Sequence, residues 1–187
     1  MSTAESVAQY TVVLCGDSTV GKTSLWCALQ HLPIPESPSN TPVAGESVEC
    51  EYRVCLSTGD WITLKVVDTG GAEKYQTFTL HRYRYGSCVV FVYAINNETS
   101  FTDIPKWVRE SHRAGFLESG FASFLIGNKT DVDERSVFQS SQHALARQMQ
   151  LTDSFETSAK YQPDQVRAVF DTIADMLHSR SKAVLGT

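Results

Sequence analysis

The sequence predicts an α/β fold: a six-stranded, mostly parallel sheet with one antiparallel strand, covered by helices on both faces. Apolar runs of strand length alternate with segments of helix length, which is the pattern of a doubly wound sheet. The turn Ser57-Thr-Gly-Asp60 separates two extended runs and predicts a hairpin, so one strand is antiparallel. In such a fold, ligands bind at the carboxyl ends of the strands.

Each element is expected from its own stretch of sequence. The strands are expected at residues 10–15, 48–56, 61–67, 88–95, 121–126 and 154–156. The helices are expected at residues 22–30, 73–84, 99–113, 136–149 and 163–180. Pro105 either lies in the first turns of its helix or kinks it. The segment 32–42 contains four prolines, which favour an extended surface loop.

Bulk properties indicate a single soluble domain. The net charge of −5 argues against a nucleic-acid partner, and no apolar run approaches the length of a membrane span, so we expect no direct membrane insertion. The polar N-terminus is not a secretory signal. Five cysteines without C-x-x-C spacing favour buried reduced thiols and a cytoplasmic location. We expect a flexible N-terminus at 1–9, one domain at 10–180 and a flexible tail at 181–187.

A glycine-bounded loop follows the first expected strand. The stretch Gly16-Asp-Ser-Thr-Val-Gly-Lys-Thr23 matches G-x-x-x-x-G-K-[ST] and precedes a helix, which is the context of a phosphate-binding loop. Main-chain N–H groups and a helix N-terminus bind phosphate there, Lys22 reaches the outer phosphates and Thr23 binds Mg²⁺. The alternative is a glycine turn before an ordinary helix. The expected nucleotide contacts are Asp17, Ser18, Thr19, Val20, Gly21, Lys22, Thr23 and Ser24.

Three further motifs each follow a strand. Asp68-Thr-Gly-Gly71 offers a carboxylate for Mg²⁺ and, at Gly71, an N–H group for a γ-phosphate. In Asn128-Lys-Thr-Asp131, the last carboxylate can accept two N–H bonds from guanine, which adenine cannot supply. In Ser158-Ala-Lys160, a main-chain N–H group can donate to the guanine oxygen. The expected base contacts are Asn128, Lys129, Asp131, Ser158, Ala159 and Lys160.

On these four motifs the chain resembles a Ras-superfamily small GTPase, a P-loop NTPase small G-domain, from about residue 10 to residue 180. The phosphate loop, the stretch Asn97-Glu-Thr-Ser-Phe101 and Trp107 are similar to the Rab branch. The resemblance implies GTP or GDP with Mg²⁺ as ligands. It also implies that Thr41, nineteen residues after Lys22, is a metal ligand beside Thr23 and Asp68; the alternative is a plain loop threonine.

The chain departs from this family at several positions. Ala72 stands where small GTPases carry the glutamine that orients the attacking water, so we expect slow hydrolysis. No aromatic residue that could stack on guanine lies at 32–34, so affinity is expected to be weaker. The segment from Thr41 to Asp68 is about four residues longer than in a typical Rab. The sequence ends without the cysteines that Rabs prenylate, which predicts no lipid anchor if this end is the natural one.

With these departures, the chain is similar to the Rab-like small GTPase subunit of the intraflagellar transport complex. That resemblance implies a cilium or flagellum location and a heterodimer with a small β-sandwich transport subunit. The apolar stripe on the last helix either docks this partner or packs on the sheet, and Asp171 and Asp175 are expected on its solvated face. Three classes remain open: a GTP-dependent scaffold, a vesicle-trafficking switch whose activating protein supplies a glutamine, and a pseudo-GTPase. The stripe comprises Val166, Val169, Phe170, Ile173, Met176 and Leu177.

Overall fold

The structure of the chain is a computed structural model that describes residues 7–34, 48–69, 87–115 and 121–185. The strands are β1 (Ala8–Cys15), β2 (Val48–Cys55), β3 (Trp61–Asp68), β4 (Cys88–Ala94), β5 (Ala122–Asn128) and β6 (Asp153–Thr157). The helices are α1 (Lys22–Leu29), α3 (Glu98–Thr102), α4 (Ile104–Arg113), α5 (Gln139–Gln148) and α6 (Pro163–Leu185).

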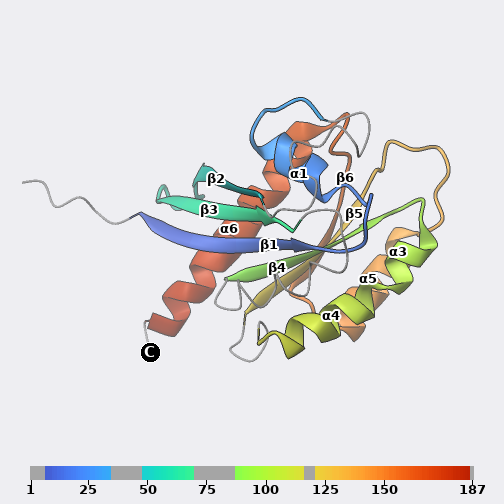
Figure 1. The fold of residues 1–187 in the computed structure, drawn as a ribbon. Helices are drawn as coiled ribbons and strands as arrows, with labels where there is room; N and C mark the ends of the chain where they lie inside the picture. The colour runs from blue at the N-terminus through green and yellow to red at the C-terminus, as the bar shows by residue number, and fades with distance from the viewer. Residues whose placement is uncertain (1–6, 35–47, 70–86, 116–120, 186–187) are drawn as a thin grey trace, which may run out of the picture.

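The strands form one six-stranded sheet in the order β2-β3-β1-β4-β5-β6 (Figure 1). Only β2 runs antiparallel to its neighbour, β3, and the other four neighbouring pairs are parallel. The turn at 57–60 joins these two strands, as the hairpin signal predicts, and the Leu56 N–H group donates to the Asp60 carbonyl at 2.8 Å. The predicted α/β fold is therefore confirmed.

Helices cover both faces of the sheet. Helices α1 and α6 pack on one face, and α3, α4 and α5 pack on the other (Figure 1). Strand β1 contributes side chains to the cores on both faces of the sheet. Val12 and Leu14 belong to the core under α6, and Val13 belongs to the core under α4. The strand is apolar throughout its buried half because helices exclude water from both of its faces.

The apolar stripe of the last helix belongs to the domain core. Phe170 and Ile173 are fully buried, and Val166, Val169 and Leu177 are in the same cluster, with Met176 packed at its edge. The stripe therefore packs on the sheet, which decides between its two interpretations.

The predicted helix at 99–113 is two helices. Helix α3 begins after Asn97, whose side-chain oxygen accepts from the Ser100 N–H group at 3.1 Å, and it ends at Thr102. Helix α4 then begins at Ile104, and Pro105 lies in its first turn. A proline is tolerated there because the first N–H groups of a helix have no partner inside the helix. Pro105 therefore marks a helix start and is not a kink.

Two other helix boundaries differ from the prediction. Helix α5 begins at Gln139, not at residue 136, because the N–H groups of Ser136 and Val137 both donate to the Ile95 carbonyl at 2.9 Å. Helix α6 continues to Leu185, so most of the predicted tail at 181–187 is helical. The predicted helix at 73–84 and most of the proline-rich segment 32–42 lie outside the described residues.

The cysteines behave mostly as expected. Four are buried free thiols, and Cys55 is an exposed one. Burial raises the pKa of Cys15 and of Cys50 to about 12, which keeps both protonated at neutral pH. Within the described ranges, no helix has the length and apolar character that crossing a membrane requires.

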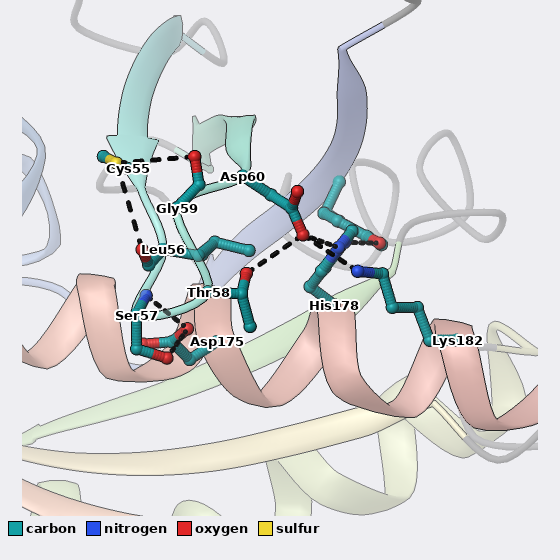
Figure 2. Close-up of polar contacts among 10 residues, drawn as sticks. Cys55, Leu56, Ser57, Thr58, Gly59, Asp60, Asp175, His178 and Lys182 are labelled. Carbon is teal, nitrogen blue, oxygen red and sulfur yellow. Dashed lines mark hydrogen bonds and ion pairs between the residues drawn. The ribbon is translucent and has the colours of Figure 1, made fainter.

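The β2–β3 hairpin is fastened to α6 by polar contacts. Figure 2 shows its turn facing three side chains of the helix. Asp175 accepts from the main-chain N–H of Ser57 at 3.2 Å and from its hydroxyl at 2.9 Å. Asp60 lies 2.8 Å from the Lys182 ammonium and 3.4 Å from the His178 ring. Asp171 accepts from the Tyr52 hydroxyl at 2.8 Å, so the two aspartates expected on a solvated face hold the hairpin instead.

We expect this attachment to contribute less stability than the apolar stripe beneath it. Phe170→Ala should lower the free energy of unfolding by about 3–5 kcal/mol because it leaves a cavity in the core. Asp175→Ala should lower it by about 1 kcal/mol because its two hydrogen bonds are partly exposed to water. Urea denaturation of both variants measures the difference. An Asp175→Ala cost equal to that of Phe170→Ala would show that the polar contacts dominate.

Candidate nucleotide-binding site

The phosphate-loop motif occupies the connection between β1 and α1, as predicted. Gly16 has φ +148°, and a Cβ atom there would lie 2.1 Å from the Val92 carbonyl oxygen of β4. Gly21 has φ +102°, and its Cβ atom would lie 2.2 Å from the Asn128 Nδ2 atom. Both positions require glycine because a side chain would collide with fixed neighbours and the backbone is left-handed. The loop is therefore packed closely against β4 and β5.

Lys22 reaches back over the loop. Its ammonium group donates to the Gly16 carbonyl at 2.8 Å and to the Asp17 carbonyl at 2.6 Å, and the residue is only 4% exposed. A buried ammonium held by carbonyls of the loop places its positive charge next to the main-chain N–H groups at the start of α1. That arrangement suits an anion at the mouth of the loop.

The expected metal ligands Thr23 and Asp68 meet. The Thr23 hydroxyl donates to Asp68 Oδ2 at 2.5 Å, although the two residues lie 45 positions apart. The neighbouring Thr69 hydroxyl donates to the Leu14 carbonyl at 3.0 Å and fixes the end of β3 to β1. The other predicted residues of this region, Thr41, Gly71 and Ala72, lie outside the described residues.

The buried side chain of Asn128 connects the loops of the site by hydrogen bonds. It is the last residue of β5, not a loop residue as the sequence suggested, and it is 1% exposed. Its side-chain N–H group donates to the Val20 carbonyl of the phosphate loop at 3.1 Å. Its side-chain oxygen accepts from the Thr157 hydroxyl and from the Ala159 N–H group, both at 3.2 Å. One amide thus joins the three predicted loops.

The two predicted base loops face one another. The Ser158 hydroxyl donates to Asp131 Oδ1 at 2.5 Å, which orients the carboxylate that we expect to bind guanine. Lys129 lies in the same motif, between Asn128 and Asp131, and has φ +70°. Burial lowers the pKa of its ammonium group. The Lys160 ammonium lies 5.0 Å over the exposed ring of Tyr161. The structure brings these residues together, and their contacts to a base stay predictions.

The residues present fit a guanine nucleotide and Mg²⁺. Hydroxyl and carboxylate oxygens such as those of Thr23 and Asp68 are ligands that Mg²⁺ prefers, and the glycine-bounded loop before the N-terminus of α1 suits a phosphate. When bound, Mg²⁺ would neutralise phosphate charge beside Lys22. Of the other predicted phosphate contacts, Ser18 and Thr19 lie in the loop, and Ser24 lies in the first turn of α1.

One anchor of the loop is not predictable from the motifs of the sequence. The indole N–H group of Trp107, in α4, donates to Asp17 Oδ1 at 2.7 Å. The sequence presents Trp107 only as a Rab-like feature and Asp17 only as an expected nucleotide contact. No short motif joins positions 90 residues apart. The one available signal was an indole among the apolar residues of a helix, since a buried indole N–H group usually has a partner.

Comparisons with known proteins identify the family of the chain. The family model described as "Ras family" matches residues 11–179. Ras-related protein Rab-19 of Rattus norvegicus is 31% identical over 176 residues, which cover 92% of this chain and 76% of that protein. Ras-related protein Rab-15 of Bos taurus is 33% identical over 151 residues, covering 80% of this chain and 68% of that protein.

Ras-related protein Rab-33 of Caenorhabditis elegans is 30% identical over 172 residues. These cover 90% of this chain but only 55% of that relative, so the chain spans about half of its length. The matched residues run from β1 into α6 and cover all four motifs of the site. The chain therefore belongs to the Ras family of small GTPases, and its relatives include Rab proteins.

Proposed function

We propose that this chain is a Rab-like guanine-nucleotide switch or scaffold that binds GTP and GDP with Mg²⁺ and hydrolyses GTP slowly. The observation that carries slow hydrolysis is Ala72, which directly follows Asp68-Thr-Gly-Gly71. A methyl group can neither donate to nor accept from the attacking water. An arginine finger works together with the water-orienting glutamine that Ala72 replaces, so we expect it to accelerate hydrolysis little at such a site.

The binding half of the proposal rests on the geometry of the described loops. Lys22 and the loop before α1 suit phosphates, Thr23 and Asp68 supply oxygen ligands, and Asp131 supplies the guanine-specific carboxylate. A chain that had lost nucleotide binding would have no reason to retain this full set, so the pseudo-GTPase class is the least favoured.

For the cellular role, we propose a scaffold subunit of intraflagellar transport in the cilium or flagellum, bound to a small β-sandwich transport subunit. Ala72 supports a role in which the bound nucleotide is held rather than turned over. The stretches Gly127-Asn-Lys-Thr-Asp131 and Phe155-Glu-Thr-Ser158 add to the resemblance behind this role.

The alternative is a divergent vesicle-trafficking Rab, and it fits the similarity to Rab-19, Rab-15 and Rab-33 equally well. In that role, an activating protein would supply the water-orienting glutamine in trans. The same nucleotide site serves both roles, so the roles differ in the partners and in lipidation.

The binding half is tested by Lys22→Ala. Loss of the phosphate-facing cation should weaken binding of fluorescent GDP by about 100-fold or more, because hydrogen bonds between charged groups are the strong ones. Lys182→Ala, which removes a surface lysine of α6, is the matched control and should bind like wild type. Equal binding by wild type and Lys22→Ala would contradict the proposed site.

The hydrolysis half is tested by Ala72→Gln. The amide should orient the attacking water and raise the single-turnover rate of phosphate release by at least about tenfold. Ala72→Leu adds similar bulk without an amide and should leave the rate low. A wild-type rate that Ala72→Gln does not exceed would mean that another residue already orients the water.

The cellular role is tested by isolating the full-length protein at its native level and identifying its companions and its intact mass by mass spectrometry. Ciliary transport subunits in near-stoichiometric amounts and no added lipid are expected. A prenylated chain with the chaperone that extracts Rabs from membranes would favour the vesicle-trafficking alternative.

A further inference from the structure

The phosphate loop is anchored to a helix that carries none of the nucleotide motifs. Asp17, the second residue of the loop, accepts a hydrogen bond at 2.7 Å from the indole N–H group of Trp107 in α4. Trp107 is 1% exposed and lies in the core under that helix, packed with Val13, Phe91 and Ile104. The ring therefore cannot move without disturbing the core, and its N–H group is a fixed point for the loop.

Asp17 transmits this fixed point to the lysine of the site. Its carboxylate is held by Trp107, and its own main-chain carbonyl accepts from the Lys22 ammonium at 2.6 Å. A displacement of Asp17 moves the carbonyl that orients Lys22. The hydrogen bond from Trp107 is therefore linked through one residue, Asp17, to Lys22, the residue that we expect to bind the outer phosphates.

The Asp17 carboxylate that accepts this hydrogen bond is partly desolvated and lies among charged side chains. Burial raises the pKa of Asp17, and the Trp107 N–H group and the charge of Lys106 act in the opposite direction, while the carboxylate of Asp103 adds to the increase. A half-buried carboxylate has few water molecules to replace a lost donor. Lys106 also lies 5.1 Å over the Trp107 ring, which helps to hold the ring in place.

We propose that Trp107 is a positioning residue of the nucleotide site: through Asp17 it holds the phosphate loop and Lys22 in the binding geometry and so slows GDP dissociation. This inference deepens the proposed function and rests on it, because the loop must bind a nucleotide for its geometry to matter. It places a determinant of nucleotide exchange on α4, outside the four nucleotide-binding motifs.

The test compares four variants by the dissociation rate of fluorescent GDP from the full-length protein. Trp107→Phe retains most of the ring but cannot donate, and Asp17→Ala removes the acceptor but keeps the main-chain carbonyl. Each should raise the rate by about tenfold, and the double variant should be no faster than the faster single one. Asp17→Asn retains an acceptor oxygen and should be slower than Asp17→Ala.

Trp26→Phe is the matched control. Trp26 lies in α1, directly after the loop, and within the described part of the chain its buried Nε1 atom has no hydrogen-bond partner. Its replacement removes an indole N–H group that anchors nothing, so the GDP dissociation rate should stay within about twofold of wild type. Thermal midpoints of the nucleotide-free proteins separate a general loss of stability from a faster release.

Each outcome decides between the possibilities. A Trp107→Phe rate equal to that of Trp26→Phe, or Asp17→Asn as fast as Asp17→Ala, would overturn the positioning role while leaving nucleotide binding intact. If Trp107→Phe fails to fold, the comparison of Asp17→Ala with Asp17→Asn still decides. A wild-type chain that does not retain GDP would instead remove the proposed function, and the positioning role would fall with it.

Discussion

The nucleotide site depends on one buried amide. Asn128 donates to the phosphate loop at Val20 and accepts from Thr157 and Ala159 at the end of β6. Because the side chain is 1% exposed, each of these polar groups would be left without water if the amide were lost. Asn128 therefore holds the phosphate end and the base end of the site in one geometry. Its side chain does so through hydrogen bonds to other groups of the protein.

The sheet makes that convergence possible. The register of β1 with β3 pairs Leu14 with Asp68, so the carboxylate that we expect to bind Mg²⁺ lies beside the first residues of the phosphate loop. The register of β5 with β6 pairs Asn128 with Thr157. Parallel strands end at the same edge of the sheet, and each motif follows a strand, so the motifs meet without any long loop to guide them.

The sequence predicted the parts that local chemistry determines. The six strands, the hairpin and the four motifs were predicted from apolar runs, turn residues and spacing, and the glycines at 16 and 21 stand where the backbone demands them. It did not predict what depends on distant partners. The late start of α5 follows from hydrogen bonds to Ile95, 41 positions before Ser136, and the Asp17 carboxylate meets Trp107 only in the folded chain. Ranges of helix-forming composition do not reveal such competing contacts.

The anchors of the phosphate loop separate binding from hydrolysis. Among the described residues, Asn128 of β5 binds the loop at Val20, Trp107 of α4 binds it at Asp17, and Gly16 lies too close to the Val92 carbonyl of β4 for any side chain. Asn128, Trp107 and Val92 belong to the packed layers of the fold, so the loop is preorganised and ordering it costs little when a nucleotide arrives. In the proposed function, the attacking water is oriented from a different segment, where Ala72 lies. The hydrogen bonds that hold the loop come from β5 and α4, so the proposed loss of the water-orienting amide is compatible with a loop that still binds its nucleotide.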